Sequence, residues 1–282
     1  MKAPRAAAAR ARRLLAVLSF ALVLAARMAA APELANPAIP PAEELDRPGE
    51  VENPFALGPG TFQVVTYLLA ANADGREAND LGAGGSAVLL QSGIRFGVGD
   101  GWEGQAFTDT YLNAADRGDD GDDPGKSRVG AGFLTLRAKW QFYQSAEGDG
   151  GLALVPFVRF SLNQALTSQA GAEPGLIVAY DVDLEHGFEL QGSSGVAVGR
   201  DDDGGRAVSW ENQIGLDWEF RPRWTAYLEP ELEVGRGVPA WALEGGVSWQ
   251  ASRAWQLDLG YNRGLGRSAH GHFGYLGAGY SF

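Results

Sequence analysis

The C-terminal stretch Gly271–Phe282, which reads GHFGYLGAGYSF, constrains the fold of this chain more than any other part of it. Counted back from the end in steps of two, the residues form one apolar row: Phe282, Tyr280, Ala278 and Leu276. The residues between them are small or polar: Ser281, Gly279 and Gly277. A period of two is that of a β-strand, whose successive side chains point to opposite faces. The pattern therefore predicts a final strand with one apolar face and an aromatic residue at its end.

The composition extends this prediction to the rest of the chain. Its 282 residues include 40 glycines and 8 tryptophans, and 45% are apolar, yet the mean hydropathy is only −0.15. These values favour short alternating strands joined by glycine-rich turns over helices. Beyond the N-terminus, no segment approaches the roughly 18 unbroken apolar residues of a transmembrane helix. If the protein spans a membrane, it must do so as a closed barrel, because its backbone groups need internal partners in lipid.

Residues 1–31 are predicted to be a cleaved secretory signal. Five basic residues within the first thirteen precede the apolar core Leu14–Ala26 and the small-residue run Ala29–Ala31. This order of charge, apolar core and small residues is typical of an export signal. Pro32 is unfavourable directly after a cut, so the cleavage position is left open by several residues. The chain has no cysteine, which excludes a lipoprotein, disulfides and thiol chemistry.

Residues 32–59 are predicted to be an extended periplasmic segment, because they are rich in Pro, Glu, Ala and Asn and show no periodicity. Residues 60–282 are predicted to form the barrel. Twelve strands are expected there: 61–71, 83–98, 102–112, 129–143, 151–163, 175–185, 188–198, 207–220, 224–234, 241–250, 255–263 and 271–282. Short turns and longer polar loops alternate between them.

An even strand count with alternating short and long connections is characteristic of a bacterial outer-membrane barrel. The predicted fold is therefore a single 12-stranded antiparallel up-and-down transmembrane β-barrel, sealed by pairing of the last strand with Thr61–Ala71. Strands 207–220 and 224–234 alternate apolar and charged residues almost completely. A soluble sandwich could also show this alternation, with the charged face in water.

The positions of the large aromatic residues distinguish these two alternatives. Eight of them flank the short turns or the C-terminus: Trp102, Phe142, Phe188, Phe220, Trp224, Trp249, Trp255 and Phe282. In a membrane barrel they would form an interfacial girdle on the periplasmic side. In a soluble protein they would be core residues packed near turns.

Three passages resemble a known family. The first is Asp46-Arg47-Pro48 with Glu52-Asn53-Pro54 and the run from Pro59 to Gln63. The second is the hairpin that joins the stretch 130–140 to 156–160, and the third is Leu257-Asp258-Leu259-Gly260-Tyr261 with the aromatic final strand. Together they are similar to the outer-membrane transporters named for the "MetA-pathway of phenol degradation". The resemblance implies a twelve-stranded barrel that admits small hydrophobic or aromatic molecules.

Charged residues on the polar faces of the strands are the candidate lining of a solute path. We expect these residues to line it: Arg95, Arg137, Lys139, Arg159, Glu211, Glu229, Glu231 and Asp258. The basic members lie in the first half of the barrel and the acidic members in the second. One hypothesis is a transverse field that orients polar or amphiphilic solutes. The alternative is that these groups form salt bridges that fill a small barrel without conduction.

The charge and the polar loops limit the partners. Removal of residues 1–31 takes away six basic groups and no acidic ones, which changes the net charge from −12 to −18. A chain with this negative charge is unlike a nucleic-acid-binding protein, which needs clustered positive charge to neutralise phosphates. Loop 113–128 contains five aspartates and loop 199–206 contains three. They could hold calcium, but their spacing lacks a terminal bidentate glutamate and favours a solvated loop, so no metal and no cofactor are expected.

The function expected from these observations is passive uptake of small hydrophobic or aromatic compounds across the outer membrane, with no enzymatic activity. The expected partners are the outer-membrane lipid bilayer, the solute, and the outer-membrane assembly machinery acting through the C-terminal strand. The first alternative is a closed structural barrel whose acidic surface loops mediate contacts. A distant third is an envelope lipid hydrolase at Ser268 and His270, for which the order and loop position are wrong and no third orienting residue is evident.

Overall fold

The computed structural model describes most of the chain from residue 51 onwards. The described ranges are 51–72, 85–116, 127–146, 149–163, 171–200, 205–235, 239–265 and 271–282. They all belong to one compact unit, Pro40–Phe282. The predicted signal peptide, the pair Ser268 and His270, and most of the loop aspartates lie outside these ranges. Within them, no helix is long and apolar enough to span a membrane.

Thirteen β-strands and one 3-10 turn make up the described chain. The strands are β1 (Phe62–Asn72), β2 (Gly85–Gly99), β3 (Trp102–Asp116), β4 (Ser127–Gly130), β5 (Phe133–Gln144), β6 (Gly150–Ser161), β7 (Ala172–Asp183), β8 (Phe188–Arg200), β9 (Arg206–Arg221), β10 (Trp224–Val234), β11 (Ala240–Gln250), β12 (Trp255–Leu265) and β13 (His272–Ser281). The turn η1 (Glu185–Gly187) separates β7 from β8.

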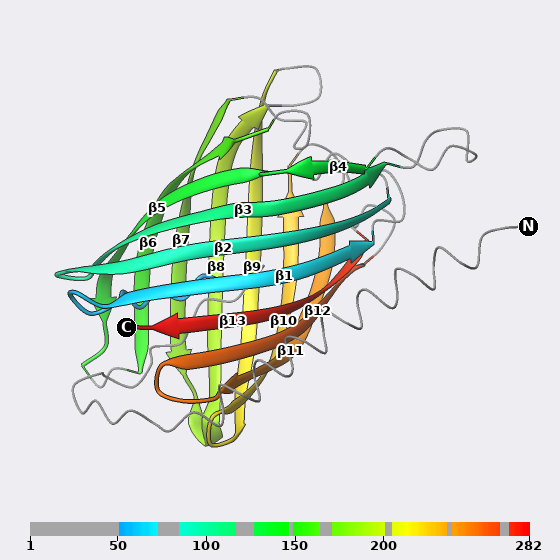
Figure 1. Ribbon diagram of the computed structural model, residues 1–282. Coiled ribbons are helices and arrows are strands. Elements are labelled where there is room, and N and C mark those ends of the chain that lie inside the picture. The colour runs from blue at the N-terminus through cyan, green and yellow to red at the C-terminus, as the bar shows by residue number, and fades with distance from the viewer. Residues whose placement is uncertain are drawn as a thin grey trace, which may run out of the picture. The chain divides into compact units, whose positions relative to one another are not determined.

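The strands pair into one closed antiparallel ring (Figure 1). Apart from β4 and β5, consecutive strands pair with each other, and β1 closes the ring by pairing with β13 from Gln63 opposite Ser281 to Asn72 opposite His272. Strand β3 pairs with β4 near its C-terminal end and with β5 near its N-terminal end, so β4 and β5 together occupy one position in the ring. The twelve-stranded barrel and its predicted closing pair are confirmed.

The stretch predicted as one strand, 129–143, is interrupted at residues 131–132. The interruption is held by β3, because the Gly132 amide donates to the Asp109 carbonyl at 3.2 Å and the Phe133 amide donates to the Asp109 side chain at 3.1 Å. A side chain at Gly132 would collide with that carboxylate, since a Cβ there would lie 2.6 Å from Asp109 Oδ2. The break therefore depends on an inward-facing aspartate of the neighbouring strand.

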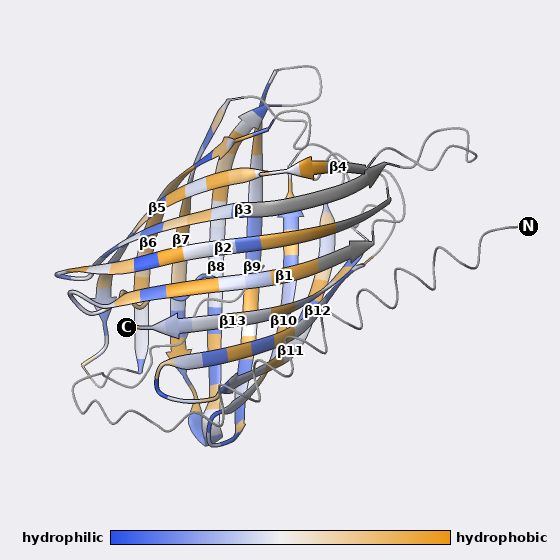
Figure 2. Cartoon of the chain, in the orientation of Figure 1, coloured by the Kyte–Doolittle hydropathy of each residue, from blue (hydrophilic) through white to orange (hydrophobic). Residues whose placement is uncertain are grey.

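The two faces of the wall have opposite chemistry on most strands, and hydrophilic and hydrophobic bands alternate along the strands of the cartoon (Figure 2). On β9, Val208 and Ile214 are 60% and 50% exposed, whereas Gln213 and Asp217 are 8% and 1% exposed. Apolar side chains thus cover the outside and polar side chains fill the inside. This is the reverse of a water-soluble protein and fits a barrel whose outer surface faces lipid.

The short turns lie at one end of the barrel, where the aromatic side chains form a nearly continuous row. Ring contacts join Trp102 to Trp140, Phe188 to Trp218, Phe220 to Trp224, Trp224 to Trp249, and Tyr280 to both Trp255 and Phe282. The tight turn between β2 and β3 has positive φ at Asp100 and Gly101, 52° and 77°. A row of outward aromatic residues at the short-turn end is the arrangement expected of an interfacial girdle.

Candidate functional site

The barrel lumen contains residues 51–58, here called the lumenal segment, which have no regular secondary structure. Val51 and Leu57 are only 1% and 3% exposed. A Cβ on Gly215 of β9 would lie 3.2 Å from Val51, and one on Gly97 of β2 would lie 1.9 Å from the Gly58 carbonyl. Strands β2 and β9 stand on opposite sides of the ring. The lumenal segment therefore crosses the inside of the barrel.

The crossing is anchored by Glu52, the one ionised side chain of the lumenal segment. Its carboxylate lies 2.7 Å from Arg137 Nη1 and 3.0 Å from Lys139 Nζ. Gln105 Nε2 donates to it from 3.4 Å. Burial alone would raise the pKa of Glu52, but the charges of Lys139, Arg137 and Arg95 outweigh burial and lower that pKa to about 2. Glu52 is thus held as an anion by the basic wall.

Backbone contacts fix the rest of the segment to β3 and β5. Lys139 Nζ donates to the Asn53 carbonyl at 2.5 Å, and the Ala56 amide donates to the Gln141 side chain at 3.0 Å. The Leu57 amide donates to Glu103 Oε2 at 2.9 Å. Inward side chains of two strands therefore satisfy backbone groups that an irregular segment would otherwise bury without partners.

Arg95 of β2 and Glu103 of β3 form a second ion pair on the basic side of the lumen. Arg95 Nε and Nη2 donate to the two carboxylate oxygens of Glu103 at 2.6 and 3.0 Å, and Nη1 donates to Gln63 at 3.0 Å. The side chains are 1% and 0% exposed. This is a bidentate, fully buried pair, which leaves Glu103 Oε2 shared between Arg95 and the lumenal segment.

Arg159 completes the basic half of the lumen. It lies 2.6 Å from Glu173 Oε2, and its guanidinium group stacks over the Phe133 ring at 4.6 Å from the centroid. All four predicted cations thus lie on the polar, inward side, and each is paired with a carboxylate. Salt bridges of the kind named in the second hypothesis are therefore present in this half of the barrel. Because each cation is next to a carboxylate, this half contributes less to an electric field across the lumen.

The predicted acidic residues occupy the other half of the ring. Glu229 and Asp258 are buried, Glu231 is partly buried and Glu211 is exposed. Asp258 accepts a hydrogen bond from Gln256 at 3.0 Å, and Glu211 accepts one from Gln213 at 2.9 Å. The structure brings these four residues to the inner face of β9, β10 and β12. Their part in solute passage stays a prediction.

Apolar side chains on the inner face are the feature that the sequence did not predict. Val65 and Tyr67 of β1 are 0% and 2% exposed and pack with Leu69 and with Phe107 of β3. We call these four residues the apolar patch. Phe107 also stacks beneath Arg137, whose guanidinium carbon is 4.9 Å from the ring centroid. Because β1 is apolar on both faces, its alternation gives no signal by which the inward residues could have been found.

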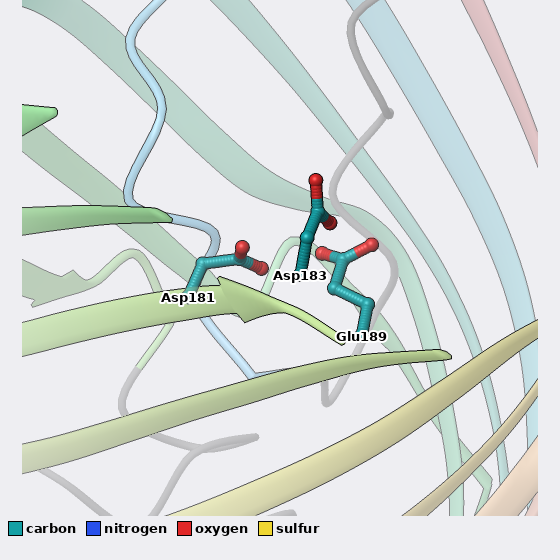
Figure 3. Close-up of side chains that lie close together, drawn as sticks. All are labelled: Asp181, Asp183 and Glu189. Carbon is teal, nitrogen blue, oxygen red and sulfur yellow. The ribbon is translucent and has the colours of Figure 1, made fainter. Parts of the chain in front are cut away.

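Three carboxylates gather near the short-turn end of β7 and β8 (Figure 3). Among the described residues, Asp181, Asp183 and Glu189 have carboxylate oxygens within 4.8 Å of one another, close enough for a metal ion. They are respectively buried, exposed and partly buried. Acidic groups of this kind are common without a metal, and we assign none.

The fold and its inverted surface define an outer-membrane β-barrel. The chain belongs to the family described as "Putative MetA-pathway of phenol degradation", which matches residues 45–282. The resemblance expected from the sequence is therefore confirmed. None of the curated proteins matches the sequence.

Solved structures with the same fold are outer-membrane proteins. The COG4313 outer membrane channel from Pseudomonas putida F1 has a TM-score of 0.64 at 15% identity, covering 85% of this chain and 100% of that one. The NanC porin has a TM-score of 0.52 at 9% identity, with 78% and 98% covered. The KdgM porin has a TM-score of 0.51 at 11% identity, with 78% and 99% covered. At these identities the likeness shows the fold.

Proposed function

We propose that this protein is an outer-membrane channel for passive uptake of small hydrophobic or aromatic compounds. The observation that carries the proposal is the apolar patch inside a lumen whose buried side chains are mostly polar or charged. Apolar surface facing water costs about 25 cal/mol per Å². Val65 and Tyr67 are fully buried, whereas Leu69 and Phe107 are only partly buried. These two residues therefore offer a favourable surface to an apolar solute.

The family description and the basic residues beside the patch support the same proposal. Phenol and its relatives combine an aromatic ring with one polar group, and Arg137 stacked on Phe107 presents a cation next to an aromatic surface. Sites for small molecules commonly combine apolar walls with a few placed polar groups. The eight predicted lining residues would then define the polar border of the path.

The closed structural barrel is the second candidate, and the lumenal segment favours it. A segment that touches strands on opposite sides of the ring obstructs the lumen. The two candidates differ in whether solutes pass through the barrel, and a flux measurement distinguishes them.

The proposal includes export by the predicted signal peptide, recognition of β13 by the assembly machinery, and a function without catalysis.

A flux assay with two adjacent substitutions tests the proposal. We expect liposomes containing the protein to take up toluene faster than empty liposomes, and to take up sugars slowly. Leu69→Asn, which keeps the size of a partly exposed inward residue but makes it polar, should lower the toluene rate, because it makes the exposed part of the apolar patch more polar. Leu68→Asn alters the neighbouring outward residue and should leave the rate unchanged.

Two results would contradict the proposal. Toluene uptake no faster than in empty liposomes would favour the closed structural barrel. Equal rates for Leu69→Asn and the unaltered protein, in a barrel that does conduct toluene, would show that the apolar patch is not on the path.

A further inference from the structure

Resting on this proposed function, we infer that Arg137 and Lys139 form a binding site for the carboxylate of a small aromatic acid, and that Glu52 occupies this site as a built-in competitor. A bound acid would take the place of Glu52 and release the lumenal segment. The inference adds a substrate class, aromatic monocarboxylates, and ties substrate binding to the opening of the lumen.

The site is already built to hold a carboxylate. Two cations from adjacent positions on the inner face of β5 converge on the Glu52 oxygens at 2.7 and 3.0 Å. Lys139 is fully buried, and the side chain of Arg137 is 28% exposed. If Glu52 left without a replacement, two cations inside the barrel would lose their shared anion, which is costly. Departure of Glu52 is therefore favourable only when another anion arrives.

The guanidinium group of Arg137 has a donor to spare. Its Nη1 donates a hydrogen bond to Glu52, whereas its Nε is buried and has no hydrogen-bond partner among the described residues. Arg binds carboxylates best through two parallel N–H donors. A free carboxylate, which is not tethered to a segment, can approach Nε and one Nη together. The ligand can thus make a contact that Glu52 does not make.

The surface beside the cations selects the rest of the ligand. Arg137 lies over Phe107, and Phe107 packs against Val65 and Tyr67 of the apolar patch. A ring attached to the carboxylate would lie against this surface and bury apolar area there. A carboxylate without an apolar body would gain nothing from the patch.

This difference matters because Glu52 competes from a high effective concentration. A tethered group is favoured over a free group with equal contacts. The pKa of Glu52, lowered to about 2, shows how strongly the cations favour a carboxylate here. Acetate offers only that charge and should not displace Glu52. Benzoate offers the same charge together with a ring and should displace it.

Thiol labelling measures the displacement directly, because the chain has no cysteine. Val51→Cys places a single thiol beside Glu52 at a position that is 1% exposed. We expect slow reaction of the purified, folded barrel with a charged maleimide, and acceleration when benzoate is added. Acetate and the neutral benzyl alcohol should leave the rate unchanged. No acceleration by benzoate would overturn the coupling of binding to release.

Calorimetry with benzoate measures the site itself. Glu52→Gln removes the competitor, and we expect benzoate to bind about tenfold more tightly or better, since the binding-competent fraction rises. Adding Arg137→Gln to Glu52→Gln should abolish this gain. Asp100→Asn removes an exposed carboxylate from the turn between β2 and β3 and is the control that should bind as the unaltered protein does.

The outcomes separate this inference from the proposed channel function. Absence of benzoate binding to Glu52→Gln would overturn the inference, whatever the toluene flux. Displacement of the segment by benzoate in a barrel that does not pass toluene would support the carboxylate site and contradict the uptake of neutral aromatic compounds.

Discussion

At the scale of single residues, the inner wall is organised by charges that are paired across neighbouring strands and with the lumenal segment. Arg95 is 1% exposed and has its guanidinium donors directed at Glu103 and Gln63. Removing one member of a buried pair is more harmful than removing both, because the remaining charge stays buried without compensation. Stability and the position of the segment therefore depend on the same few side chains.

Arg95→Met should destabilise the folded barrel by about 3 to 5 kcal/mol, because Glu103 would remain buried without its bidentate partner. The double variant Arg95→Met/Glu103→Leu should recover much of that loss. Denaturant titration in detergent, followed by the mobility difference between folded and unfolded barrel, measures both. A double variant as unstable as Arg95→Met would show that the uncompensated charge is not the cause.

The pH dependence of the lumenal segment follows from Glu52. Because its pKa falls from an unfolded value of 4.5 to about 2 in the barrel, its stabilisation is fully present above pH 4.5 and is lost as the pH falls towards 2. The contribution of Glu52 should therefore be constant from pH 7 to pH 5.

Bilayer recordings compare the unaltered protein with Glu52→Gln. We expect the variant to conduct more at pH 7, and the difference between the two proteins to shrink as the pH falls below 4.5 towards 2. Comparing the two proteins at each pH removes the effect of other carboxylates that titrate in both. A difference that is the same at pH 7 and near pH 2 would contradict the role given to Glu52.

At the scale of elements, the strands were largely predictable and the lumenal segment was not. Strand β10, Trp224–Val234, has the predicted bounds, because its alternation and flanking turns are unambiguous. The break before Phe133 depends on Asp109 of another strand, which local patterns do not reveal. Residues 51–58 show no periodicity, so their contacts inside the barrel could not be read from the sequence.

The charged residues of the site that lie on strands could be predicted from the sequence. Its apolar residues and its partner in the lumenal segment could not. Arg137 and Lys139 were expected on the inner face because they alternate with Leu136 and Ala138 on β5. Their partner, Glu52, lies outside any strand, and sequence spacing does not connect it to β5. The apolar patch escaped prediction because inward apolar residues are indistinguishable from lipid-facing ones on a strand such as β1.

Removing residues 51–58 should open the lumen without unfolding the barrel. The contacts that hold the segment come from inward side chains, whereas the wall is held by its own ladders between strands. We expect a severalfold higher single-channel conductance and a barrel that still folds, with somewhat lower resistance to heating because Arg137 and Lys139 lose Glu52. A shortened chain that conducts no better than the intact one would show that the segment is not the main obstruction.

At the scale of the whole molecule, charge is distributed unevenly around the ring. The cations of β2, β5 and β6 are compensated by Glu103, Glu52 and Glu173. The inner faces of β9, β10 and β12 carry carboxylates, and the net charge of the chain without residues 1–31 is −18. Small inorganic ions respond to this summed field, whereas an aromatic acid responds to the local cations at Arg137 and Lys139.

The open barrel should therefore prefer potassium to chloride. A reversal potential measured across a salt gradient for the barrel without residues 51–58 tests this expectation. Glu229→Gln combined with Asp258→Asn should weaken the preference, because it removes two carboxylates from the inner wall. A preference for chloride would contradict the assigned charge balance.

The pairing of β1 with β13 has a consequence for biogenesis. These strands come from opposite ends of the barrel sequence, yet they form a continuous ladder from Gln63 opposite Ser281 to Asn72 opposite His272. A chain that lacks its final strand leaves both β1 and β12 with unsatisfied edges. Ring closure therefore depends on the last residues to be synthesised, and the barrel can close only after β13 has been made.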